Sequence, residues 1–205
     1  RVWKDETVQL ELPDMGEAAS ESKMMDSIPQ INVDKLHAEN VTGKGIKVGV
    51  LDTGIDYNHP DLKDVYKGGY DFVDNDNDPM EATYEDWKNS GLPERHPASG
   101  SAYYTEHGTH VSGTIAGGQK NGVDYAVKGV APDVELYSYR VLGPYGSGAT
   151  SGILAAIEKS IADQMDVINL SLGASTNNPL YPTSVAVNNA MLSGVVTVVA
   201  AGNSG

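Results

Sequence analysis

Residues 46–54 read Ile-Lys-Val-Gly-Val-Leu-Asp-Thr-Gly, a mostly apolar, β-branched run that ends in an Asp-Thr-Gly turn. A short run of this kind, bounded by turn-forming residues, is typical of a strand buried on both faces of a parallel sheet. Functional side chains of such sheets collect at the carboxyl ends of the strands. Asp52 stands at that position, so this stretch predicts a fold class and a first candidate residue together.

Segments of the same two kinds alternate along the rest of the chain. Further strands are expected at residues 134–142, 166–172 and 195–200, and helical spacing appears at residues 108–117, 150–164 and 183–192. The predicted buried stripe of the second helix consists of Ile153, Leu154, Ile157 and Ile161. Strands that alternate with helices require crossover connections, which predict an α/β fold with a doubly wound parallel sheet flanked by helices.

The composition excludes several classes of protein. The 205 residues include 28 acidic and 14 basic side chains, and a formal net charge of −14 disfavours nucleic acid as a partner. No cysteine is present, which excludes a disulfide scaffold, a thiolate metal site and a cysteine nucleophile. No apolar run approaches the roughly 20 residues of a membrane span, so no membrane partner is expected.

The first residues differ in character from the rest. Residues 1–12, RVWKDETVQLEL, alternate enough to indicate one strand, with Val2, Val8, Leu10 and Leu12 apolar. Residues 13–26 are polar, small and broken by proline and glycine, which is typical of a linker or a processing site. We therefore divide the chain into an N-terminal segment, residues 1–25, and a domain, residues 26–205.

Asp52 has more than one interpretation. Aspartate often follows a strand simply because it caps the next turn. Asp-Thr-Gly is also the triplet of aspartic proteases, but that chemistry needs two such carboxylates sharing a proton on an all-β scaffold. This chain holds one Asp-Thr-Gly in an α/β context, so the aspartic-protease interpretation fails.

Two later segments also carry candidate chemistry. Residues 106–114, EHGTHVSGT, open a helix with His107 and His110 three positions apart. The two histidines could form a surface or core pair, or bind zinc, although no third ligand is spaced as a metal motif requires. Asn203 follows the last predicted strand, where it could form a turn or donate an amide hydrogen bond to a developing oxyanion.

Taken in order, the motifs resemble those of the subtilisin-like serine proteases. The resemblance covers roughly residues 28–205 and rests on D-T-G-I-D (52–56), H-P-D-L (59–62), H-G-T-H-V-S-G-T (107–114), G-V-A-P (129–132), N-L-S-L-G (169–173) and A-A-G-N-S-G (200–205). Agreement at this many ordered positions is very unlikely to arise by chance.

The resemblance implies a role for each candidate. Asp52 would hold the imidazole tautomer, His107 would act as general base and then acid, and Asn203 would donate to the tetrahedral oxyanion. His110 would pack within its helix. Two segments would hold the substrate as an added β-strand: Gly146, Ser147 and Gly148, and Ser171, Leu172 and Gly173.

The sequence departs from the family at the nucleophile. The family's serine lies in a G-T-S-M-A-type segment downstream of the oxyanion asparagine, and no such segment occurs here. We therefore expect a catalytic domain that is incomplete at its C-terminus, that is inactive alone, and that has the remaining part of the domain as a partner. A non-catalytic calcium- or peptide-binding module on the same fold is the alternative.

Within this family the chain resembles the larger secreted proteases of bacilli, the minor extracellular proteases with an inserted protease-associated domain. This resemblance implies a secreted endopeptidase that acts on polypeptides. It also implies that residues 1–25 are the end of a propeptide, which would serve as inhibitor and folding aid.

One acidic stretch suggests a structural metal. Residues 69–78, GYDFVDNDND, carry Asp71, Asp74, Asp76 and Asp78, and carboxylates at this density suit calcium. An EF-hand is disfavoured because Pro79 stands where that loop needs glycine. The stretch instead resembles a calcium loop of thermitase-like subtilisins, with an acidic solvated turn as the alternative. A second family site, at Asp61, is not expected.

Overall fold

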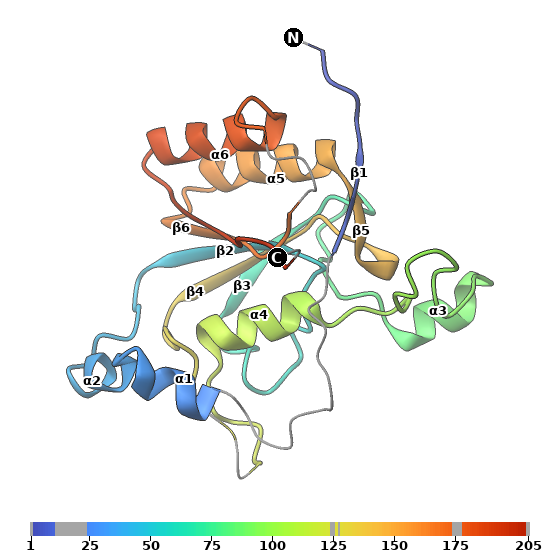
Figure 1. The fold of residues 1–205 in the computed structure, drawn as a ribbon. Coiled ribbons are helices and arrows are strands. Elements are labelled where there is room, and N and C mark those ends of the chain that lie inside the picture. The colour runs from blue at the N-terminus through green and yellow to red at the C-terminus, as the bar shows by residue number, and fades with distance from the viewer. Residues whose placement is uncertain (1, 11–23, 124–125, 127, 174–177, 204–205) are drawn as a thin grey trace.

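A twisted parallel sheet forms the centre of the molecule in this computed structural model, which describes residues 2–10, 24–123, 126, 128–173 and 178–203. The strand order in this sheet is β3 (Tyr66–Asp71), β4 (Glu135–Arg140), β2 (Lys47–Asp52), β6 (Val167–Leu170) and β7 (Val196–Val199), and all neighbours are parallel. Figure 1 shows α5 (Thr150–Ala162) and α6 (Pro182–Leu192) on one face and α4 (His107–Ala116) on the other. The α/β, doubly wound prediction is confirmed.

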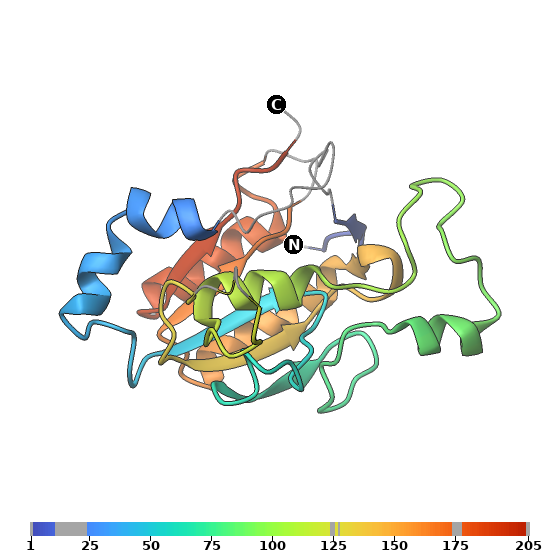
Figure 2. The same ribbon diagram turned by 90° about the horizontal axis from the view of Figure 1, so that it is seen from below.

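The central strand β2 divides the core because its side chains alternate between the two faces. Val48 and Val50 belong to the apolar cluster that includes Ala116 of α4. Leu51 belongs to a second cluster, on the opposite face, that includes Ile153 and Ile157 of α5. Figure 2, seen from below, looks onto the sheet with α4 (yellow-green) in front of it. The apolar run quoted first is thus buried on both sides, as a strand in the middle of a parallel sheet must be.

The predicted strands and helices of the domain are present, with ends that differ by a few residues. Within the predicted stripe of α5, Ile153 and Ile157 are fully buried, whereas Leu154 and Ile161 are only half-buried. Ala156 and Ser160 fill the centre of the stripe instead, because small side chains let the helix lie close to the sheet. Three short helices were not predicted: α1 (Met24–Gln30), α2 (Val33–Ala38) and α3 (Tyr84–Ser90).

Strand β3 was also missed, and the beginning of the proposed calcium loop, residues 69–71, lies inside it. Its sequence, YKGGYD, has two glycines in place of the β-branched residues that mark a strand. Gly69 has a φ of 156°, and a Cβ there would lie 1.7 Å from the carbonyl oxygen of Ser138 on β4. The close approach of the two backbones therefore requires glycine at position 69. A sequence pattern does not reveal this requirement.

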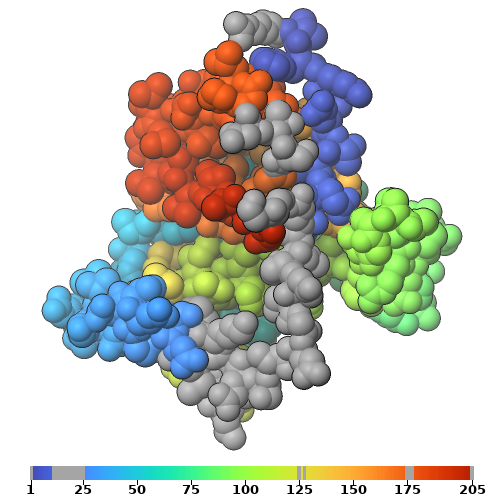
Figure 3. Space-filling view, viewed as in Figure 1, coloured from blue at the N-terminus to red at the C-terminus, as the bar shows by residue number. Residues whose placement is uncertain are grey.

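The N-terminal strand lies outside the main sheet. Strand β1 (Thr7–Gln9) pairs antiparallel with β5 (Ser147–Ala149), so the predicted strand at residues 1–12 is shorter than expected. Figure 3 shows this blue segment lying along the surface beside the α5–α6 layer. Of the predicted linker, residues 13–26, the part up to residue 23 lies outside the described residues, and residues 24–26 belong to α1. The division of the chain at residue 25 stays a prediction.

No helix in the described ranges is long and apolar enough to cross a membrane.

Helix α4 begins in close contact with the turn that follows β2. A Cβ placed on Gly108, in the first turn of the helix, would lie 2.1 Å from the carbonyl oxygen of Gly54. A Cβ on Gly113, in the middle of the same helix, would meet nothing within 4 Å. Two glycines of one helix therefore differ in what they contribute to the fold.

We expect Gly108→Ala to destabilise the protein by about 1–3 kcal/mol, because the added methyl group overlaps backbone that cannot move aside. Gly113→Ala should leave stability unchanged or raise it by about 0.5–1 kcal/mol, since alanine is the better helix former and space is free. Urea unfolding of the protein and both variants measures the difference. Equal effects of the two substitutions would contradict the close contact at Gly108.

Candidate active site

The first two candidate residues lie in direct contact. Asp52 is the last residue of β2, and His107 is the first residue of α4. The Nδ1 atom of His107 lies 2.8 Å from Oδ1 of Asp52, although the residues are 55 positions apart in the chain. The Asp52 side chain is 1% exposed, whereas that of His107 is 23% exposed. One ring nitrogen is therefore held by a buried carboxylate, and the imidazole keeps an open side toward solvent.

The pair has an unusual electrostatic setting. The hydrogen bond that the His107 ring donates to Asp52 raises the pKa of His107 above its ordinary value of 6.5. Burial of the ring opposes this increase, and the negative charges of Asp52 and Glu81 add to it. Oδ1 of Asp52 also accepts the backbone N–H of Thr53 at 2.7 Å. The buried Oδ2 contacts no hydrogen-bond donor within the described residues. The carboxylate is thus directed toward the imidazole, which favours a charged imidazolium.

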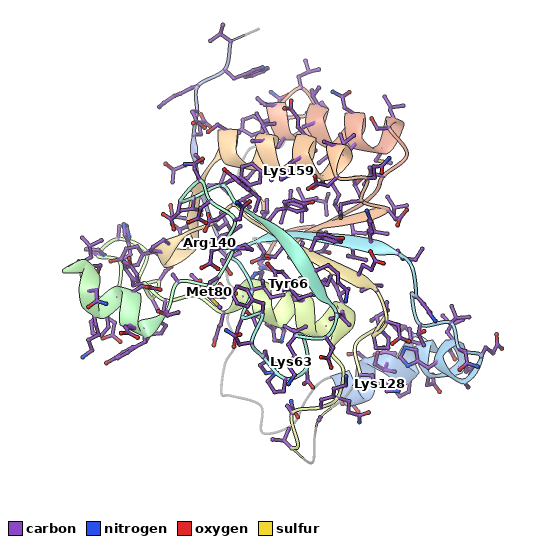
Figure 4. The ribbon with its side chains drawn as sticks, turned by 180° about the vertical axis from the view of Figure 1, so that it is seen from behind. Lys63, Tyr66, Met80, Lys128, Arg140 and Lys159 are labelled. Atoms are coloured by element: carbon purple, nitrogen blue, oxygen red, sulfur yellow. The ribbon has the colours of Figure 1, made fainter. Side chains whose placement is uncertain are left out.

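Thr53, the residue after Asp52, locks the two elements together. Its Oγ1 accepts the backbone N–H of Gly108 at 2.9 Å, and its carbonyl oxygen accepts the Nε–H of Arg140 at 3.2 Å. The Arg140 guanidinium also donates to the carboxylates of Asp71 (2.6 Å) and Asp74 (2.8 Å). Figure 4 shows Arg140 on the side of the sheet nearest α3. A largely buried hydrogen-bond network therefore holds the carboxyl end of β2 in place.

The second histidine has a different environment. His110 was expected to pack within the helix, but it is exposed. The side chain points outward because the interior stripe of α4 is occupied by Gly108, Ser112 and Ala116. Since Nδ1 of His107 is engaged by Asp52, the two histidines do not act as a pair, and the zinc interpretation has no support among the described residues.

Asn203 follows β7 and is exposed. It lines an open hollow of about 630 Å³ together with Gln9 and Leu10 of the N-terminal segment and Arg95. The asparagine therefore lies at the end of the strand that occupies the edge of the sheet.

The predicted segment Gly146–Gly148 is occupied by residues of the same chain. Thr7, Val8 and Gln9 pair with Ala149, Gly148 and Ser147 in antiparallel register. Beyond the strand, the Leu10 N–H donates to the carbonyl oxygen of Gly146 at 2.8 Å. The Val8 side chain is 4% exposed and joins the apolar cluster on the α5 side of the sheet. Main-chain bonds and one buried side chain hold the strand, as expected for recognition by strand addition.

The other predicted segment follows β6. Ser171 and Leu172 are half-buried and Gly173 is exposed. Oγ of Ser171 accepts a hydrogen bond from Nδ2 of Asn169 at 2.8 Å, and Leu172 packs against the same apolar cluster as Val8. Residues 174–177, which follow, lie outside the described residues.

The acidic stretch is arranged around a guanidinium. Asp71 is buried, and besides its pairing with Arg140 it accepts the backbone N–H groups of Val73 and Asp74. Asp78 accepts the Tyr57 hydroxyl at 2.8 Å, and Asp76 accepts the N–H of Asp78. Within the described ranges no three carboxylates or imidazoles are grouped closely enough to hold a metal ion. In this arrangement the guanidinium of Arg140 compensates the buried charge of Asp71.

Sequence reasoning missed three contributors to this region. Thr53 and Glu81 both accept hydrogen bonds from the first turn of α4, and nothing in their local sequence indicates it. Tyr145, with a left-handed φ of 63°, precedes the strand-binding segment. Its hydroxyl donates to the carbonyl oxygen of Pro93 at 2.5 Å and its ring contacts Tyr103. The two adjacent tyrosines at positions 103 and 104 were the one available signal.

Comparison with known proteins indicates the same family as the sequence motifs. The subtilase family model matches residues 43–205. The chain is 48% identical to the minor extracellular protease Vpr of Bacillus subtilis over 194 residues, which are 93% of this chain and 22% of that protein. It is 42% identical to subtilisin E of the same species, over 87% of this chain and 39% of that protein.

A solved structure agrees as well. The crystal structure of a cold-adapted subtilisin-like serine proteinase matches with a TM-score of 0.58 and 33% identity, over 80% of this chain and 48% of that one. The chain thus spans less than half the length of each of these relatives. The family match, the identities and the shared architecture agree with the order of motifs along the sequence. The chain therefore belongs to the subtilase family.

Proposed function

We propose that the protein carrying this chain is a secreted serine endopeptidase, in which Asp52 and His107 are two members of the catalytic triad. The observation that carries the proposal is the 2.8 Å contact between His107 Nδ1 and a buried carboxylate at the end of β2. A carboxylate in this position fixes the imidazole so that Nε2 can receive a proton from a nucleophile.

The proposed mechanism follows from that geometry. A serine hydroxyl in a part of the protein beyond residue 205 attacks the peptide carbonyl carbon while its proton moves to Nε2 of His107. Asp52 stabilises the resulting imidazolium, and the Asn203 amide donates to the oxyanion. The C–N bond then breaks as His107 returns the proton to the amine, and water hydrolyses the acyl-enzyme by the same steps. No serine of the present chain stands in the family's nucleophile context, so we expect this part alone to be inactive.

The proposed substrate is a polypeptide bound as an added strand along β5. The pairing of β1 with β5 supports this because it shows that the edge accepts an extended segment in antiparallel register. Ser171–Gly173 would form the other side of the cleft. Since main-chain bonds are common to all peptides, specificity would come from pockets such as the one that buries Val8.

We propose that the N-terminal segment is the end of an inhibitory propeptide. Its strand occupies the edge on which substrate would bind, and its side chains contribute further bonds: Gln9 Nε2 donates to the carbonyl oxygen of Tyr145 at 2.6 Å, and Asp5 accepts from the N–H of Ser151 at 2.9 Å. A segment held in this way blocks access until it is removed. Secretion is supported by the extracellular relative.

A further partner is proposed for the β7 end of the molecule. Val196, Val198 and Val199 of β7 and Leu192 at the end of α6 are exposed, the last to 86%. Neighbouring apolar residues on a terminal sheet strand favour coverage by more protein. We propose that the serine-bearing part of the catalytic domain covers them.

Calcium at Asp71, Asp74, Asp76 and Asp78 stays a prediction, and the pairing of Asp71 and Asp74 with Arg140 does not favour it. Thermal melting with added calcium and with a chelator tests it. A calcium-dependent rise in Tm, lost in an Asp76→Asn, Asp78→Asn variant, would support the site. An unchanged midpoint would remove these residues as ligands.

Asp52→Asn should lower kcat of the full-length protein by about four orders of magnitude, because the base loses its tautomer. His107→Ala should lower it by about six orders, because the nucleophile loses its base. His110→Ala, a change of the exposed histidine on the same helix, is the control and should retain activity. Hydrolysis of a chromogenic peptide measures all three. Loss of activity in the His110 variant, or retention in the His107 variant, would overturn the assignment.

The same pair predicts the pH profile. Asp52 raises the pKa of His107 above 6.5, so the base becomes protonated at a higher pH than free imidazole does. We therefore expect kcat/KM to fall as the pH drops through this raised pKa. A kcat/KM profile over pH 5–9 checks this. An acidic limb below pH 6.5 would contradict the electrostatic setting described for His107.

A peptide with the sequence of residues 2–10 should inhibit the processed enzyme by binding along β5. Its Val8→Asp form should bind roughly ten-fold or more weakly, because Val8 is buried. A Val2→Asp peptide is the matched control, since Val2 is fully exposed, and should inhibit as well as the parent. Equal inhibition by all three peptides would contradict binding through the Val8 pocket.

A further inference from the structure

One buried carboxylate near the pair has no part in the mechanism above. Glu81 is 5% exposed and lies in the segment between β3 and α3. Oε1 accepts the backbone N–H of Thr109 at 2.9 Å and its hydroxyl at 3.0 Å, while Oε2 accepts the hydroxyl of Thr105 at 2.5 Å. A carboxylate buried with three donors is built into the structure and is not an incidental surface charge.

These bonds fall on the first turn of α4, where helix N–H groups need partners. The N-cap residue Glu106 makes no side-chain capping bond, and no acidic residue lies in the first turn. The N–H of Gly108 is accepted by Thr53, and that of Thr109 by Glu81. Glu81, in a distant segment, therefore supplies the negative charge that a helix N-terminus favours. Its contact residue in the helix, Thr109, lies two positions after His107.

The same carboxylate is linked to the element that carries Asp52. The Thr109 hydroxyl that donates to Glu81 also accepts the backbone N–H of Asp56 at 2.8 Å, in the segment after β2. Next to this, the N–H of Ile55 donates to the carbonyl oxygen of Pro79 at 2.9 Å. The end of β2, the segment that holds Glu81 and the start of α4 are thus bound to one another within a few residues of the pair.

We propose that Glu81 is a positioning residue for His107: its carboxylate holds the first turn of α4 in register with the end of β2, and its charge stabilises the imidazolium that forms during catalysis. The inference rests on the proposed function, because it assigns Glu81 to the same reaction. Glu81 contacts no reacting atom and acts through α4.

The charges around the imidazole agree with this role. Asp52 on β2 contacts the ring, and after it Glu81 contributes to the raised pKa of His107. Glu106 and His110, on either side of His107 in the helix, are exposed. Glu81 lines a hollow of about 550 Å³, whose other charged residues are Asp74, Asp76, Asp78, Asp86 and Arg140. Nη1 of Arg140 donates hydrogen bonds to Asp71 and Asp74. The Glu81 carboxylate accepts its hydrogen bonds from Thr105 and Thr109 instead.

The test is Glu81→Gln in the full-length protein, with Glu85→Gln as a matched control on an exposed residue of α3. We measure the pKa of His107 by NMR and the pH dependence of kcat and KM. A nearby negative charge favours the protonated imidazole, so removing the charge of Glu81 should lower the pKa of His107. The acidic limb of kcat/KM should move to lower pH by the same amount, kcat should fall several-fold and KM should change little. Glu85→Gln should match the parent.

Each outcome decides the matter. A lower kcat with an unmoved limb and an unchanged His107 pKa would mean that Glu81 is merely structural, and the proposal would be wrong. If Glu81→Gln does not fold, Glu81→Asp carries the test: the charge stays but the bonds to Thr109 lengthen, so kcat should fall while the limb stays, and an unchanged kcat overturns the role. If the parent protein hydrolyses no peptide, the proposed function fails, and the NMR pKa still reports on Glu81.

Discussion

The molecule is organised around the close approach of the N-terminus of α4 to the turn that follows β2. Gly108 lies against the carbonyl oxygen of Gly54, and the Gly108 N–H donates to the hydroxyl of Thr53. With the two backbones in contact, the first side chain of the helix can reach the last carboxylate of the strand. The hydrogen bond between His107 and Asp52 follows from this contact, and the orientation of α4 on its face of the sheet does too.

Bringing these elements together buries charge, and the fold compensates each group separately. Asp52 is compensated by the imidazole and a backbone N–H. Asp71 is compensated by Arg140, which reaches from the end of β4. Glu81 is satisfied by two threonines and the first turn of α4. Burial makes each partner matter, since a buried carboxylate that loses its donors is far costlier than an exposed one.

The proposed peptide recognition uses a separate, two-stranded sheet formed by β1 and β5. The chain's own residues 7–9 occupy the edge formed by β5 in antiparallel register. The same main-chain bonds would serve a substrate and an inhibitory segment. Under the proposed function the two segments would compete for this edge, and the side chains that enter the pockets would decide which one binds.

Much of this was available from the sequence. The apolar run at residues 46–51 predicted the central strand, and the ordered motifs predicted that Asp52 and His107 belong to one site, because backbone pattern and motif spacing are local properties of the chain. The missed features share a cause. Strand β3 depends on the close contact between Gly69 and Ser138. In α5, Ala156 is buried at the centre of the helix face where Leu154 was predicted. The roles of Thr53, Glu81 and Arg140 depend on partners 28–87 positions away in the chain. The sequence by itself determined the fold class and the family, and it predicted the pair formed by Asp52 and His107. Only the tertiary structure decided which residues support that pair, since hydrogen bonds between distant segments exist only once the layers have packed.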